Sequence, residues 1–264
     1  MAALSQLQPL SLDQFKVVRL IATDMDGTLT QHGKFTPALL QVLTELAANG
    51  IQVLIVTGRS AGWVNGIVSY LPVVGAIAEN GGLFYQASGG EELLVPIFDL
   101  VEHRQQLAEM FGGLQAEFPQ IQESSDNRFR ITDWTFDVQG LSLEDLQQMH
   151  DRCQSAGWDF TYSTVQCHIK PLHQEKAIGL SQVLNQYFPD LTPEQIVTVG
   201  DSPNDESLFA GDRFPLAVGV ANVLHYVDRL AHKPAYVTQA SEVAGFCELA
   251  QLILKAFHSS SRSG

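Results

Sequence analysis

Short apolar runs and longer stretches of helical spacing alternate along the first part of the chain. Residues 17–23 (VVRLIAT) form a mostly apolar run that leads directly to Asp24, which is typical of a buried strand. Thr36 and Pro37 are the residue types of a helix N-cap and a first helical position, and Gly50 is typical of a helix end. The apolar positions between them are Leu39, Val42, Leu43 and Leu46. This pattern predicts a strand followed by an amphipathic helix.

The same alternation continues and then returns near the C-terminus. Residues 51–56 and 76–78 are apolar runs that predict two more strands. Beyond residue 171, the pattern predicts a helix with one apolar face, three short strands and a closing helix; these are residues 177–187, 195–199, 216–220, 235–237 and 242–257. Strands that alternate with helices in this way predict an α/β fold, with a parallel sheet covered by helices on both faces.

A less regular region separates these two stretches. Residues 130–138 and 159–170 alternate polar and apolar positions, whereas residues 142–157 have helical spacing. Alternating strands around a helix predict a half-solvated α+β sheet. We therefore expect two units: residues 1–82 and 171–264 form one, and residues 83–170 are inserted into it.

The charge balance excludes some classes of partner. Lys and Arg number 15 against 29 Asp and Glu, a formal net charge of -14, which disfavours binding to nucleic acid or to an anionic membrane. Cys153, Cys167 and Cys247 are too scattered for a disulfide framework or a C-x-x-C zinc site. With no signal-like N-terminus and no apolar run of membrane-spanning length, we expect a cytoplasmic protein. An anionic substrate would need a local cation to offset the charge of this protein.

Three polar clusters follow predicted buried strands, at residues 24–28 (DMDGT), 57–59 (TGR) and 200–205 (GDSPND). Ligands of open α/β sheets bind outside the carboxyl ends of the strands, so these distant segments are expected to converge on one crevice. Carboxylates that lie close together repel one another unless they share a cation. The three clusters therefore predict a cation-dependent site.

These clusters, with Lys176 between the last two, resemble the four ordered motifs of haloacid dehalogenase (HAD) superfamily phosphatases. The position of the insertion, after residues 79–82 (ENGG), resembles the type IIB cap of Cof-like, sucrose-phosphate and mannosyl-phosphoglycerate phosphatases. The resemblance implies a Rossmann-like core with an inserted α+β cap. It also implies a phosphatase that uses Mg²⁺.

The resemblance assigns roles to the acidic residues. Asp24 would be the nucleophile that forms an aspartyl-phosphate, and Asp26 the general acid and base. Mg²⁺ would be bound by the Asp24 carboxylate, the Asp26 backbone carbonyl and the Asp201 carboxylate. Asn204 and Asp205 would orient Asp201 or metal-bound water.

It also assigns the phosphate contacts. Thr57 and the Gly58 amide would donate to phosphate oxygens, and Lys176 would pair with the phosphate. The run Glu175-Lys176-Ala177 departs from the usual pattern of a small polar residue, lysine and glycine. Lys170 is the alternative for this role.

Further residues are candidate substrate contacts. Arg59 either contacts substrate or forms a structural ion pair, and Asn80 either lines the site or belongs only to the turn into the insertion. Arg128 and Arg130 lie two apart on a predicted strand, which would project both from one face. Gln166, His168 and Lys170 have the same spacing on a later strand. The sheet face that carries these side chains would bind the substrate. His168 has no partner at metal-binding spacing.

The predicted function is hydrolysis of a small phosphorylated metabolite, with a sugar phosphate as the expected substrate. A phosphosugar mutase uses the same aspartyl-phosphate chemistry and stays an alternative. A non-catalytic metabolite-binding protein is a third possibility, although a pure binder has no need of Asp26 beside Asp24. The sequence leaves the individual substrate and the oligomeric state open.

Overall fold

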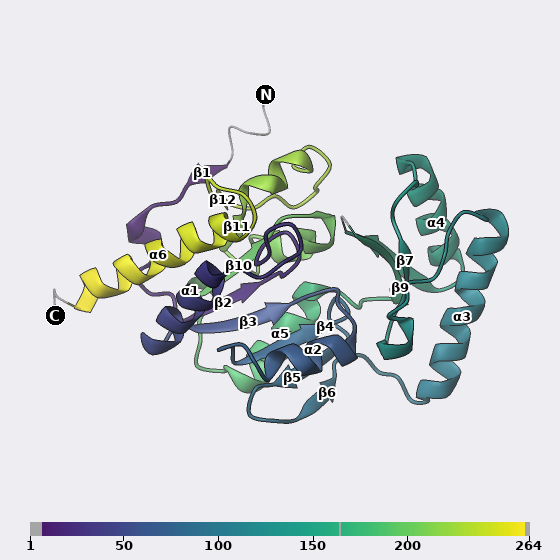
Figure 1. The fold of residues 1–264 in the computed structure, drawn as a ribbon, viewed down its shortest axis with the longest axis horizontal. Coiled ribbons are helices and arrows are strands. Elements are labelled where there is room, and N and C mark those ends of the chain that lie inside the picture. The colour runs from purple at the N-terminus through teal and green to yellow at the C-terminus, as the bar shows by residue number, and fades with distance from the viewer. Residues whose placement is uncertain (1–6, 164, 262–264) are drawn as a thin grey trace.

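The computed structural model describes residues 7–163 and 165–261, which contain two separate sheets (Figure 1). The larger sheet has nine strands in the order β1 (Gln8–Pro9), β12 (Tyr236–Val237), β11 (Leu216–Gly219), β10 (Ile196–Gly200), β2 (Leu20–Thr23), β3 (Gln52–Val56), β4 (Gly75–Ala78), β5 (Leu83–Gln86) and β6 (Glu91–Leu93). From β1 to β4 every neighbouring pair is parallel.

Helices cover both faces of the larger sheet, as the alternating pattern predicts. The helices on one face are α1 (Pro37–Ala48), α2 (Ala61–Val68) and α6 (Glu242–Ser261), and the helix on the other is α5 (Lys176–Tyr187). Within β2, Ile21 packs on the α1 face while Leu20 and Ala22 pack on the α5 face, because side chains alternate along a strand. The 3₁₀ turns are η2 (Leu12–Phe15), η4 (Pro193–Gln195), η5 (Pro203–Phe209) and η6 (Ala221–His225). The Thr36 hydroxyl accepts from the Leu39 amide at 3.3 Å, which makes Thr36 the N-cap of α1.

The second sheet is small and antiparallel, with strand order β7 (Trp134–Asp137), β9 (Gln166–Pro171) and β8 (Trp158–Tyr162). It packs against α3 (Leu100–Glu117) and α4 (Leu143–Ser155) around its own apolar cluster, which includes Phe136, Met149 and Ile169. Together with η3 (Asn127–Phe129), these elements are called the cap unit below; they lie to one side of the larger sheet in Figure 1. The predicted α/β fold with an additional α+β unit is confirmed.

The first strands after residue 82 differ from the expectation that the insertion begins there. β5 pairs antiparallel with β4, and β6 pairs with β5, so residues 83–93 extend the larger sheet. The turn between β4 and β5 is tight because Glu79, Asn80 and Gly81 all have positive φ (53°, 55° and 104°). A hairpin at the sheet edge satisfies the backbone of β4, which a direct exit into the cap unit would leave unpaired.

The strand register brings the three polar clusters to one edge of the larger sheet. Thr23 at the end of β2 pairs with Val199 of β10 on one side and with Ile55 of β3 on the other. Asp24, Thr57 and Asp201 follow these strand ends, so all three leave the sheet at its carboxyl edge. In the described part of the chain, no helix is long and apolar enough to cross a membrane.

Candidate active site

Lys176 forms the electrostatic centre of the acidic cluster. Its Nζ donates to Asp24 Oδ1 at 2.6 Å and to Asp205 Oδ1 at 2.7 Å, and its side chain is fully buried. Burial opposes the ammonium charge, but the Asp205 and Asp24 carboxylates outweigh it and raise the pKa of Lys176 above its ordinary value. Lys170, the alternative, lies elsewhere and pairs with Asp159 and the Gln174 carbonyl.

Asp201 lies beside Asp24 and is held by groups that the sequence pattern did not reveal. Its Oδ1 accepts from the Thr28 hydroxyl at 3.0 Å, and its Oδ2 accepts from Asn222 Nδ2 at 2.8 Å. A Cβ at Gly27 would lie 2.6 Å from Asp201 Oδ2, so only glycine allows this approach. Asn222 also donates to the Gly27 carbonyl. The only sequence signal for Asn222 was its place just after a predicted strand.

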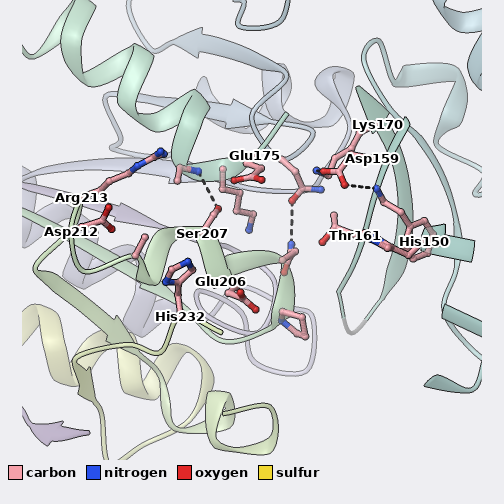
Figure 2. Close-up of a pocket in the computed structure, with 17 residues that line it drawn as sticks. His150, Asp159, Thr161, Lys170, Glu175, Glu206, Ser207, Asp212, Arg213 and His232 are labelled. Carbon is pink, nitrogen blue, oxygen red and sulfur yellow. Dashed lines mark hydrogen bonds and ion pairs between the residues drawn. The ribbon is translucent and has the colours of Figure 1, made fainter. Parts of the chain in front are cut away.

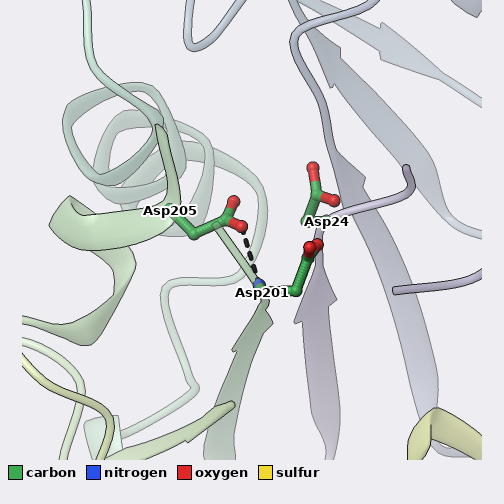
Figure 3. A group of neighbouring side chains, drawn as sticks. All are labelled: Asp24, Asp201 and Asp205. Carbon is green, nitrogen blue, oxygen red and sulfur yellow. Dashed lines mark hydrogen bonds between the residues drawn. The ribbon is translucent and has the colours of Figure 1, made fainter. Parts of the chain in front are cut away.

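The Asp24, Asp201 and Asp205 carboxylates come within 4.8 Å of one another (Figure 3). Burial, followed by repulsion from Asp205, raises the pKa of Asp24 to about 7, and burial with repulsion from Asp24 raises the pKa of Asp201 well above its ordinary value. Asp205 is already engaged, because Oδ1 accepts from Lys176 and Oδ2 accepts from the Asp201 and Ser202 amides. Among the described residues, Asp24 Oδ2 accepts no hydrogen bond, and each Asp201 oxygen accepts one and keeps a second lone pair. This donor set fits Mg²⁺, a hard ion that prefers carboxylate oxygen.

Two donors of the Thr57–Gly58 loop are without a partner in residues 7–163 and 165–261. The Gly58 amide makes no hydrogen bond there, and the Thr57 hydroxyl only accepts, from the Arg59 amide at 3.2 Å. The Gly58 carbonyl points the other way and accepts from Arg130 Nη1 at 3.0 Å. This loop therefore offers donors to an anion beside Asp24.

Asp26 and Arg59 form a bidentate ion pair at the same edge. Arg59 Nε donates to Asp26 Oδ2 at 2.7 Å and Arg59 Nη2 donates to Oδ1 at 2.6 Å. The hydrogen bond to Asp26 raises the pKa of Arg59 above its ordinary value. Of the two interpretations of Arg59, the ion pair describes this structure.

The predicted placement of Arg128 and Arg130 on one strand face is wrong. Residues 127–129 form the 3₁₀ turn η3, and the strand begins only at Trp134. A turn does not alternate its side chains, so Arg128 is exposed and stacks over Phe129, whereas Arg130 is buried. The two arginines therefore have different environments.

Arg130 belongs to a buried charged network between the two sheets. Its Nη1 donates to Asp133 Oδ1 at 2.9 Å, and His168 Nδ1 lies 2.8 Å from Asp133 Oδ2. Burial lowers the pKa of His168, which favours the neutral ring with Nδ1–H donating to Asp133. Arg130 and His168 reach the Thr57–Gly58 loop from the cap unit: a Cβ at Gly58 would lie 3.1 Å from His168 Cε1.

Glu79 anchors this network to the larger sheet, and its role was missed at the level of sequence. Its carboxylate accepts from the Ala61 amide at 2.9 Å, the Thr132 amide at 2.6 Å and the Thr132 hydroxyl at 2.7 Å, and also from the Ile131 and Asp133 amides. Burial raises the pKa of Glu79 to about 7, with a further contribution from Asp133. The sequence signal that could have identified Glu79 as a buried functional residue is its position directly after the apolar run 76–78. No comparable signal marks Asp133.

Asn204 lines two cavities. A small one of about 20 Å³ is lined by Asp24, Asp26, Thr57, Gly58, Arg59, Ser163, Val165, Gln166, His168, Ser202 and Asn204. A larger one of about 530 Å³ lies between the cap unit and η5; Figure 2 shows Lys170, Asp159 and Thr161 on one side of it and Glu206 and Ser207 on the other. Gln166 and His168 thus line the small cavity with Asp24, whereas Lys170 lines the larger one with Lys176 and Asn80.

Comparison with known proteins agrees with this geometry. Residues 21–96, which contain Asp24, Asp26 and the Thr57–Gly58 loop, match the family described as haloacid dehalogenase-like hydrolase. In this part the chain is similar to the haloacid dehalogenase-like hydrolases. The predicted resemblance to this family and the predicted enzyme class are confirmed.

Several known proteins are similar to this chain over most of its length. A phosphoglycolate phosphatase from Saccharolobus solfataricus is 26% identical over 250 residues, which cover 90% of this chain and 97% of that protein. One from Thermoplasma acidophilum is 24% identical over 195 residues, 73% of this chain and 81% of that protein. A crystal structure from Thermoplasma acidophilum has a TM-score of 0.73 at 21% identity, covering 90% of this chain and 98% of the other. The sucrose-phosphatase of Synechocystis has a TM-score of 0.64 at 17% identity, covering 89% and 97%.

Proposed function

We propose that this hydrolase is a Mg²⁺-dependent phosphomonoesterase that removes phosphate from a small metabolite through an aspartyl-phosphate on Asp24. The observation that supports this most strongly is the environment of Asp24. A buried lysine holds one of its oxygens at 2.6 Å, and the donors of the Thr57–Gly58 loop line the same cavity. A carboxylate beside donors that favour an anion is the arrangement that in-line attack on phosphorus requires.

The free oxygen of Asp24 is proposed to form the bond to phosphorus as the bond from phosphorus to the leaving oxygen breaks. Asp26 gives a proton to that leaving oxygen. In the second step a water oxygen attacks the same phosphorus, Asp26 takes the water proton, and inorganic phosphate leaves as the Asp24 carboxylate is restored. Thr57, Gly58 and Lys176 would hold the phosphoryl oxygens in both steps.

Arg59 is proposed to orient the ionised form of Asp26, which takes the water proton in the second step. The bidentate pair at 2.7 and 2.6 Å holds both carboxyl oxygens at the cavity that Asp26 shares with Asp24. Proton donation in the first step requires that Asp26 give up one of these two hydrogen bonds and carry a proton on that oxygen.

The cation is proposed to be held by the carboxylates of Asp24 and Asp201 and by the backbone carbonyl of Asp26. When bound, Mg²⁺ neutralises charge on the phosphoryl oxygens and orients the phosphate. The raised pKa values of Asp24 and Asp201 support this assignment, because burial and mutual repulsion disfavour both carboxylate charges even with Lys176 beside Asp24, and a bound cation would offset them.

Two classes of substrate are candidates. The cavity around Asp24 and Asp26 measures about 20 Å³ and is lined by Gln166 and His168 from the cap unit, so it does not by itself set the size of the leaving group. Several relatives are named phosphoglycolate phosphatase, which makes this two-carbon compound the first candidate. A sugar phosphate is the second candidate, because the adjoining cavity of about 530 Å³ could receive a larger leaving group.

A phosphate-release assay across chain lengths tests the proposal. Phosphoglycolate, glycerol phosphate, hexose phosphates and a disaccharide phosphate would be compared with Mg²⁺ present, with Asp24→Asn as the inactive control. Release of inorganic phosphate at each turnover supports a phosphatase. Isomerised product without free phosphate would identify a mutase, and binding without turnover would identify a non-catalytic protein.

A further inference from the structure

Asn80 carries a buried amide donor without a partner. Its side chain is 2% exposed, and in the described part of the chain Nδ2 makes no hydrogen bond. A buried polar group without a partner is destabilising, so native structures seldom leave one unless a ligand or water satisfies it. The backbone role of Asn80 is separate: its amide donates to the Thr57 carbonyl at 3.0 Å, in a turn where its φ is 55°.

The orientation of this amide is set by a chain of hydrogen bonds. Ser202 Oγ donates to Asn204 Oδ1 at 2.7 Å, which directs Asn204 Nδ2 toward Asn80. Asn204 Nδ2 then donates to Asn80 Oδ1 at 3.2 Å. Asn80 Oδ1 is therefore the accepting end, and Nδ2 is the end left to donate. Ser202 and Asn204 lie one and three residues after Asp201. The loop at residues 200–205 therefore sets the direction of the Asn80 amide.

The free donor lies at the Thr57–Gly58 loop. A Cβ at Gly58 would be 3.1 Å from Asn80 Nδ2, so the amide lies against the Gly58 backbone. The Gly58 amide and the Thr57 hydroxyl proton are unpartnered at the same place among residues 7–163 and 165–261. Asn80 and Lys176 also line the larger cavity, and Asn204 lines both cavities. The Asn80 donor thus lies beside the Gly58 backbone, next to the two unpartnered donors of the Thr57–Gly58 loop.

We propose that Asn80 Nδ2 donates a hydrogen bond to an oxygen of the phosphoryl group, and that Asn204 is the positioning residue that directs it there. This rests on the proposed phosphatase function, because the ligand is the phosphoryl group attacked by Asp24. Lys176 is engaged by two carboxylates, so neutral donors supply hydrogen bonds to the phosphoryl group without another buried charge. Asparagine also tolerates a positive φ better than most residues, which lets one residue serve the turn and the ligand.

Asn80→Asp is the sharpest test, because it keeps the shape and the turn preference but replaces the donor with a repelling oxygen. Removing one preorganised oxyanion donor typically costs about 10²–10³-fold in kcat. We expect Asn80→Asp to lose about that much on a minimal aryl phosphate, and its inhibition constant for inorganic phosphate to rise at least tenfold. Asn80→Gly removes the amide without backbone strain and serves if the aspartate variant does not fold; it should show a smaller loss in the same two measurements. Melting temperatures of both variants near the wild-type value would exclude a merely structural effect.

Asn204→Asp separates orientation of Asn80 from an effect on the metal. It places a carboxylate against Asn80 Oδ1, which favours rotation of the Asn80 amide and withdraws Nδ2 from the phosphate. The expected result is weaker inhibition by inorganic phosphate with an unchanged Mg²⁺ concentration for half-maximal activity. A shift of the Mg²⁺ dependence alone would assign Asn204 to the metal and overturn its positioning role.

Binding of inorganic phosphate, measured by calorimetry with Mg²⁺, distinguishes failure of this inference from failure of the proposed function. A wild-type protein that binds phosphate but hydrolyses no substrate would overturn the function and still test Asn80. Phosphate affinity and kcat/KM within threefold of wild type in folded Asn80→Asp would overturn the role of Asn80. A wild-type protein that neither binds nor releases phosphate would overturn both.

Discussion

Replacing Lys176 with methionine removes the one side-chain cation that touches Asp24 in the described structure. The lysine is fully buried and bridges Asp24 at 2.6 Å and Asp205 at 2.7 Å, so methionine leaves two buried carboxylates without a counter-charge. Breaking a buried pair by removing one partner typically costs about 3–5 kcal/mol. We expect Lys176→Met to lower the free energy of unfolding by about that amount in EDTA, and to abolish phosphate release.

Lys170→Met is the matched control, because Lys170 is also buried and hydrogen-bonded. Its partner Asp159 keeps 18% of its side chain exposed, so water can solvate the carboxylate that remains. A loss of about 1–3 kcal/mol is expected, with activity retained if Lys176 carries the phosphate role. This pair of variants also decides between the two lysines that the sequence left open.

Urea unfolding with and without Mg²⁺ provides the measurement. A ligand that binds only the folded state stabilises it by about 2.7 kcal/mol at 100 times its dissociation constant, so Mg²⁺ should restore part of the stability that Lys176→Met loses. An unfolding free energy within 1 kcal/mol of wild type in EDTA would refute the electrostatic reasoning. Phosphate release by Lys176→Met at the wild-type rate would refute it as well.

Four further outcomes are expected. Hydrolysis should require Mg²⁺, stop in chelator and be inhibited by Ca²⁺, whose larger and looser shell would misplace Asp24; full activity in excess EDTA would contradict the proposed metal site. Asp26→Asn should lower kcat by about 10²–10⁴-fold. Calorimetry should show that Mg²⁺ binding is partly kept, because the ligand proposed at this position is the backbone carbonyl. Near-wild-type turnover would exclude Asp26 as the general acid. Alanine at His168 or Arg130 should raise KM for the best substrate more than for an aryl phosphate, whereas the exposed Arg128 should tolerate alanine; equal kinetics for all three would place specificity elsewhere. The pKa of Glu79 is raised to about 7 by burial, so its contribution to stability is present below its ordinary pKa of 4.5 and is lost as the pH rises through 7. Relative to Glu79→Gln, which does not titrate, the wild type should therefore lose up to about 3 kcal/mol of unfolding free energy between pH 4 and 8, as 1.36 kcal/mol per pKa unit implies; a difference that stays flat or grows with pH would contradict this.

The sequence by itself determined the elements whose signals are local. The Thr36–Pro37 helix start, the run that leads to Asp24 and the apolar face of α5 follow from caps and periodicity, which depend on neighbours within a few residues. The order of strands and helices was enough to predict a parallel sheet, and hence the convergence of Asp24, Thr57 and Asp201 at one edge.

Sequence reasoning failed where the partner of a residue lies far along the chain. The spacing predicts Arg128 and Arg130 on one strand face, but residues 127–129 form a turn. Arg130 is buried and hydrogen-bonded to Asp133, whereas Arg128 is exposed to solvent. The sequence pattern also places β5 and β6 in the insertion, because residue type alone does not distinguish the tight turn at positive φ after β4 from an exit loop.

Only the tertiary structure revealed the partners of the buried charges. Glu79 is 53 residues from Thr132, and Lys176 is 152 residues from Asp24, yet each pair forms a short hydrogen bond. A buried ionisable group must find compensating partners wherever the fold brings them, and no periodicity or local propensity encodes that choice. Local residue patterns therefore determined the strands and helices, whereas the long-range packing of the cap unit against the larger sheet decided which polar groups meet at Asp24.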